Sequence, residues 1–147
     1  MTEFHDELRS RVRGSYTLEA GTEMLIRAFG GRFAAPGNPW VEEDPMTGKA
    51  WIDFGAIPAT IGALSCGEQR ILMLAASVAA DVPVGLGEIL DGLDRPLVDL
   101  ALAAFAHVSG SHWDSEVRPS DDGTYLVHGP RPGTLYPWPE ENTPNVS

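Results

Sequence analysis

Residues 65–80 read SCGEQRILMLAASVAA, and this stretch decides the fold. Its first four residues form a capping box, in which the Ser65 hydroxyl accepts a hydrogen bond from the amide of Glu68 and the Glu68 carboxylate reaches back to the amide of Ser65. Between Ile71 and Ala80 only Ser77 is polar. Because a helix without a polar face has to be covered on every side, we expect this helix to lie inside the protein.

A second apolar helix follows downstream. Asp94 can cap it, Pro96 is tolerated in its first turn, and Gly110 ends it. Between residues 97 and 108 only two side chains are polar, and several alanines allow a neighbouring helix to approach closely. We predict that the two apolar helices bury each other. The expected core cluster consists of Leu72, Leu74, Val78, Leu97, Leu100 and Phe105.

The remaining helical signals are amphipathic or weak. Residues 17–29 form a helix with one apolar and one charged face, ended by Gly30-Gly31. Glu23 and Arg27 stand four positions apart on the charged face, the spacing of a helical ion pair. We expect this helix to lie on the surface of the core. Residues 3–13 are patterned as a short additional helix.

Two hairpins are expected. Residues 40–42 and 50–54 read as strands joined by turn-rich residues, with Trp40 and Trp51 placed to stack across the pair. A second, weaker hairpin is predicted from residues 116–118 and 124–128. The fold class is therefore α+β: a small helical core of two buried helices plus one amphipathic helix, with one or two short antiparallel hairpins. We expect residues 1–128 to form a single compact domain.

Composition and charge exclude several classes of function. The chain has 147 residues, of which 21 are acidic and 10 are basic, and its net charge is −11. Because such a surface repels phosphate backbones, we expect no direct binding to nucleic acid. No apolar run reaches the length of a membrane span, the first residues show no secretory signal, and one cysteine excludes a disulfide framework. We therefore expect a cytoplasmic protein that contacts no membrane.

Residues 64–70, LSCGEQR, resemble the signature motif of ABC-type ATPases. The resemblance continues through Gly87-Glu88, where that family has its metal-binding Asp-Glu pair, and through residues 92–94, which are similar to its D-loop. Such a likeness implies nucleotide hydrolysis. The chain lacks the phosphate-binding loop that this chemistry requires, because its Gly48-Lys49 has neither the earlier glycine nor the following Ser or Thr. We therefore interpret residues 65–68 as a helix cap.

A few side chains could carry chemistry of another kind. Cys66 stands in the first turn of a helix, where the helix dipole favours a thiolate. His107, His112 and Asp114, with His128, are the candidate metal ligands, but a glycine separates the first two histidines and their spacing matches no zinc template. We expect no metal and no cofactor. A small metal- or thiol-dependent enzyme remains an alternative function.

The C-terminal residues 129–147 contain five prolines and form an extended tail. Within it, Leu135, Tyr136 and Trp138 are candidate binding anchors that dock in a groove of a partner, of a second copy or of the same chain. The leading hypothesis is a non-catalytic protein-binding module, such as an adaptor, an accessory subunit or an immunity-type inhibitor. The partner is then a protein or a second copy. A second hypothesis is an acidic mimic of nucleic acid that inhibits a nucleic-acid enzyme.

Overall fold

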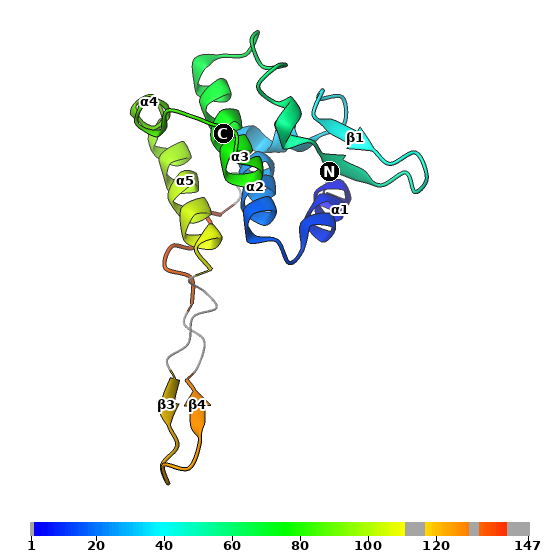
Figure 1. Ribbon diagram of the computed structural model, residues 1–147. Coiled ribbons are helices and arrows are strands. Elements are labelled where there is room, and N and C mark those ends of the chain that lie inside the picture. The colour runs from blue at the N-terminus through cyan, green and yellow to red at the C-terminus, as the bar shows by residue number, and fades with distance from the viewer. Residues whose placement is uncertain (1, 111–116, 130–132, 141–147) are drawn as a thin grey trace.

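The computed structural model describes residues 2–110, 117–129 and 133–140. Within these residues, five α-helices and two antiparallel two-stranded sheets confirm the α+β class (Figure 1). The helices are α1 (Thr2–Val12), α2 (Tyr16–Arg27), α3 (Cys66–Ala80), α4 (Leu86–Asp91) and α5 (Arg95–Val108). Strand β1 (Val41–Glu43) pairs with β2 (Ala50–Ile52), and β3 (Val117–Pro119) pairs with β4 (Leu126–His128). Short 3₁₀ segments occupy Ala28–Ala34, which is kinked at residues 29–31, and Phe54–Ala56.

Most of the expected helix boundaries are confirmed. The amide of Glu68 donates to the Ser65 hydroxyl at 3.3 Å, and the amide of Ser65 donates to the Glu68 carboxylate at 3.1 Å, so the capping box begins α3. Asp94 caps α5 by accepting from the amide of Leu97 at 3.1 Å. Helix α2 begins slightly earlier than expected, because Ser15 caps it.

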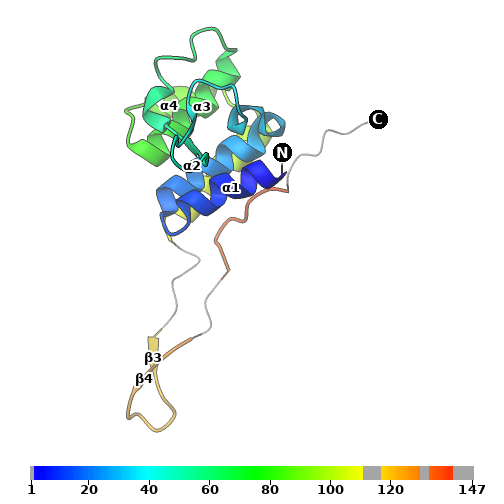
Figure 2. The same ribbon diagram turned by 90° about the vertical axis from the view of Figure 1, so that its right-hand side faces the viewer.

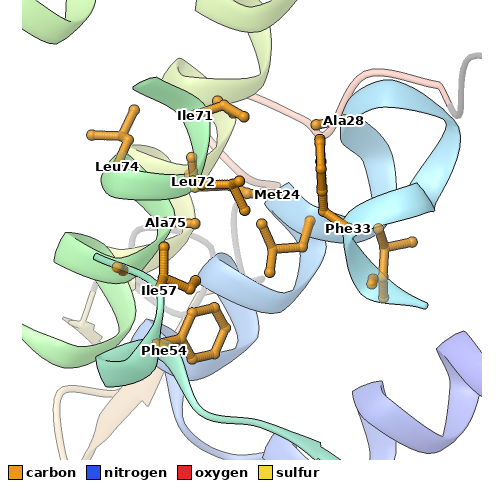
Figure 3. Close-up of a cluster of buried hydrophobic side chains, with 14 of the residues drawn as sticks. Met24, Ala28, Phe33, Phe54, Ile57, Ile71, Leu72, Leu74 and Ala75 are labelled. Atoms are coloured by element: carbon orange, nitrogen blue, oxygen red, sulfur yellow. The ribbon is translucent and has the colours of Figure 1, made fainter. Parts of the chain in front are cut away.

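The centre of the core is α2, which corrects the prediction that α3 and α5 bury each other. Helix α2 packs against α1, α3 and α5, whereas α3 and α5 make few contacts with each other. Figure 3 shows side chains from α2, from α3 and from the segment containing Phe54 and Ile57 meeting in one cluster. Helix α2 is central because its buried face is broad enough to contact several neighbours. This face comprises Ala20, Gly21, Thr22, Met24, Leu25 and Ile26.

Helix α5 is buried on one side only. Its small residues, including Ala101 and Ala104, face the core, while Leu102 and Phe105 are 43% and 37% exposed. The expectation that Phe105 belongs to the core is therefore wrong. Alanines let α5 approach α2 closely, and Leu97 and Leu100 are buried on the same side. No other described helix covers the opposite side, so Leu102 and Phe105 stay at the surface.

The first hairpin forms as expected, but its two tryptophans do not stack. Trp51 is the cross-strand partner of Glu42, and among the described residues it makes no ring contact with Trp40. Trp40 instead lies just before β1, is 2% exposed, and donates its indole N–H to the carbonyl oxygen of Phe33 at 2.8 Å. A buried indole needs such an acceptor, and the chain after α2 supplies it.

The second hairpin, residues 117–128, projects away from the helices and is called the arm (Figures 1 and 2). Every residue of β3 and β4 is exposed. At its tip, the hydroxyls of Ser120 and Thr124 donate to the Asp122 carboxylate at 2.6 and 2.7 Å and lower the pKa of Asp122 to about 2. In the part of the chain that the structure describes, no helix is long and apolar enough to cross a bilayer.

Candidate functional site

The described part of the tail, residues 133–140, runs back along the chain's own helices (Figure 2). The Trp138 ring packs against the core, with its centroid 5.7 Å from that of the His107 ring and 5.5 Å from the guanidinium carbon of Arg27. Nη1 of Arg27 also donates to the carbonyl oxygen of Pro139 at 2.5 Å. These contacts join the tail to α2 and α5 of the same chain.

The other two predicted anchors are more exposed. The Tyr136 hydroxyl donates to the Asp99 carboxylate on α5, and this hydrogen bond raises the pKa of Tyr136 because it favours the protonated phenol. Leu135 is 81% exposed. The structure thus brings Tyr136 and Trp138 onto α5 and leaves Leu135 in solvent.

An open groove of about 1190 Å³ lies between the first half of α5, the residues after α2 and the tail. We call it the α5 groove. Apolar side chains on its walls come from three separate segments: Phe29 after α2, Leu102 on α5 and Tyr136 on the tail. Each of them is more than a third exposed. In the part of the chain that the structure describes, the groove therefore presents exposed apolar surface in a concave setting.

Phe29 has an unusual backbone conformation at this groove. Its φ is 50° and its ψ is 39°, in the left-handed region that large L-residues avoid. Gly30 and Gly31 continue in the same region. The conformation turns the chain sharply after α2, and the Phe29 ring packs edge-on against Phe33 with centroids 5.6 Å apart. The apolar pattern predicts Phe29 on a helix face, but α2 ends at Arg27 and Phe29 belongs to the left-handed turn that the glycine pair beside it indicates.

A second hollow of about 190 Å³ lies under Trp138, between α1, α2 and α5. We call it the Trp138 pocket. Its lining comprises Arg9, Val12, Arg13, Glu19, Thr22, Glu23, Arg27, His107 and Trp138. Composition alone did not indicate it, because its charged residues come from segments far apart in the sequence.

Glu23 organises the charges of this pocket. The Nε atoms of Arg9 and Arg27 donate to its two carboxylate oxygens at 2.6 and 2.8 Å, which confirms the predicted pair with Arg27. Burial raises the pKa of Glu23, but the hydrogen bonds and charges of both arginines outweigh burial and lower the pKa overall. Nearby, Nε2 of His107 lies 3.1 Å from a carboxylate oxygen of Glu19.

The candidate metal ligands are not gathered together in the described residues. His107 borders the Trp138 pocket, whereas His128 is exposed on β4 of the arm. His112 and Asp114 lie outside the described residues. Within residues 2–110, 117–129 and 133–140, no group of three or more His, Cys, Asp or Glu side chains could hold a metal ion. Cys66 is exposed at the first residue of α3.

The residues that resemble an ATPase signature contact one another and their neighbours. Glu68 receives hydrogen bonds from Ser65 and pairs with Arg32 at 2.7 Å, and these contacts lower its pKa. The Arg70 side chain lies against Gly92, where an added Cβ would come within 1.4 Å of its Nη1. These residues therefore begin α3 and pack it against α4.

Comparison with known protein families, curated proteins and solved structures finds no match.

Proposed function

We propose that the protein is a non-catalytic protein-binding module that holds a basic, amphipathic segment of its partner in the α5 groove. The observation that supports this function is the groove itself, because it exposes apolar side chains of Phe29, Leu102 and Tyr136 on concave walls. Contiguous exposed apolar surface is typical of interaction sites, and large aromatic and aliphatic anchors dominate the energy of such contacts.

Charge favours a basic partner. The groove is bordered by three carboxylates, Asp94, Asp99 and Glu140, and by two arginines, of which Arg27 is already paired with Glu23. The whole chain carries a net charge of −11. Attraction between opposite charges accelerates association and weakens as salt is added. A basic segment with apolar anchors therefore complements both the apolar walls of the groove and the carboxylates that border it.

The strained turn at Phe29 fits this function. A bulky residue in the left-handed region costs on the order of 1–3 kcal/mol, and such conformations are concentrated at functional sites. Here the conformation presents a 39% exposed aromatic ring to the groove. Glycine would adopt this backbone conformation without the steric cost that phenylalanine has. The presence of an aromatic ring here therefore supports a role in recognition.

The test is selection of peptides from a random phage-displayed library against the purified chain. We expect enrichment of sequences that combine Lys or Arg with Leu, Ile or Phe. Leu102→Glu should weaken the selected peptides about tenfold or more, because a charge replaces an apolar wall. Leu86→Glu is the matched control, since Leu86 is 46% exposed on α4 and does not line the groove.

Two results would contradict the proposal. Equal binding by wild type and Leu102→Glu would show that the α5 groove is not the site. Enrichment of peptides with basic residues alone, whose binding disappears with added salt, would instead favour the acidic mimic of nucleic acid.

A further inference from the structure

Basic side chains gather around the Trp138 pocket although the chain as a whole is acidic. Among the described residues, three arginines and two glutamates line the pocket. The lowered pKa of Glu23 keeps its carboxylate ionised between Arg9 and Arg27. Three of the ten basic residues of this acidic protein are thus concentrated at one pocket.

Thr22 supplies a polar group that nothing in the described structure uses. Its side chain is 1% exposed and lines the pocket, and its hydroxyl oxygen has no hydrogen-bond partner among the described residues. Buried hydroxyls nearly always have a partner, and valine would fill the same volume without leaving a polar atom unpaired. A purely structural position would therefore favour valine, whereas a hydroxyl can donate to a bound oxygen atom.

The outer wall of the pocket is aromatic. Trp138 lines the open pocket on the tail side, and Val12 adds apolar surface from α1. The volume of about 190 Å³ corresponds to roughly six water molecules at about 30 Å³ each. An inorganic ion alone would leave much of that space empty, while a small ring carrying one acidic group would fill it and contact the Trp138 ring.

From these features we infer that the Trp138 pocket binds a small organic carboxylate whose body is planar and apolar. The arginines attract the carboxylate, the Thr22 hydroxyl donates a hydrogen bond to it, and Trp138 and Val12 contact the planar body. Two arginine N–H groups that donate hydrogen bonds to the two carboxylate oxygens would recognise the carboxylate with a defined geometry. The inference does not depend on the α5 groove binding a protein.

The experiment is an NMR titration of the ¹⁵N-labelled full chain with benzoate as the probe. The indole N–H of Trp138 and the amide of Thr22 report on the pocket directly. We expect both signals to shift saturably with benzoate and not with benzamide, which has the same shape without the charge. Inorganic phosphate, which has the charge without the ring, should bind at least about tenfold more weakly.

Variants locate the site. Arg13→Gln should weaken benzoate binding about tenfold, because a hydrogen bond to a charged group is lost. Arg11→Gln is the matched control, since it makes the same charge change two residues away, in the last turn of α1 and outside the pocket lining. Thr22→Val should weaken binding similarly and Thr22→Ser should restore it, with circular dichroism verifying that each variant is folded.

The inference is overturned if benzoate produces no saturable shift, or if benzamide or phosphate binds as tightly as benzoate. It is equally overturned if the folded Arg13→Gln and Thr22→Val variants bind benzoate as wild type does.

Discussion

Replacing Gly21 with alanine should force α2 and α3 apart. The added Cβ would lie 2.7 Å from the Cβ of Ala79 on α3 and 3.1 Å from two ring carbons of Phe54. Carbon atoms normally approach to about 3.5–4.0 Å. The Ala79 Cβ is fixed to a helix backbone and cannot rotate away, so the helices themselves must move. Since α1, α3 and α5 all pack on α2, the displacement reaches the whole core.

Two opposing effects set the magnitude. Overpacking of a tight core costs about 1–3 kcal/mol, while exchanging glycine for alanine within a helix stabilises it by about 1 kcal/mol. We expect the steric effect to dominate, with a net loss of about 1–2 kcal/mol in the free energy of unfolding. For a chain of this length, each kcal/mol lowers Tm by about 2–4 °C.

Urea unfolding followed by circular dichroism measures the loss. Gly67→Ala is the control, because Gly67 lies in the first turn of α3 and an added Cβ there meets nothing within 4 Å. This variant should be as stable as wild type or slightly more stable. In an Ala79→Gly background, the cost of Gly21→Ala should shrink by about 1 kcal/mol or more, because the closest contact has been removed. If Gly21→Ala were as stable as Gly67→Ala, the close packing of α2 on α3 would be refuted.

Four further predictions follow from the same packing. Ser65→Ala should cost about 1 kcal/mol by removing a helix cap, and a thermal melt identical to that of wild type would contradict the capping box. Met24→Ala should cost about 2–5 kcal/mol in urea unfolding because Met24 is fully buried, whereas Phe105→Ala should cost clearly less because Phe105 is 37% exposed; equal costs would place the core elsewhere. The folded pKa of Glu23 lies below its ordinary value of 4.5, so its ion pairs contribute fully above that pH and are lost as the pH falls through the folded pKa. Glu23→Gln should therefore reduce the loss of stability on acidification, and an unchanged pH profile would refute this role. Truncation after His128 should leave a cooperative helical transition, because the buried core residues all precede the arm, and loss of that transition would show that the tail is needed for folding.

Local structure was predictable because its causes are local. The capping box at Ser65, the cap at Asp94 and the turn at Gly30-Gly31 each depend on a few neighbouring residues, and each is present. The pairing of Glu23 with Arg27 also follows from helix spacing alone. The α+β class follows from the sum of these short-range signals.

The partners of each helix were not predictable in the same way. The apolar pattern of residues 97–108 fits a helix covered on all sides, yet its alanines face α2 and Phe105 remains exposed. Which face is covered depends on how many neighbours are available, and that is a property of the whole chain. The Trp138 pocket was missed for the same reason, since Arg9, Glu23 and His107 meet only after the helices pack.

The arm also offers a way to separate the protein into two interacting pieces. In chain order, its exposed tip lies between the helices and the tail, and exposed loop tips are the preferred places for proteolytic nicking and for insertions. Cleavage of a protease site inserted there would leave the fragment that contains residues 133–140 joined to the helices through the pairing of β4 with β3 and through contacts such as those of Tyr136 and Trp138. Cleavage would convert the intramolecular contact into a bimolecular one, and dilution would then separate the two pieces measurably. The dissociation constant of the released fragment would report how firmly β4 and the tail together are held.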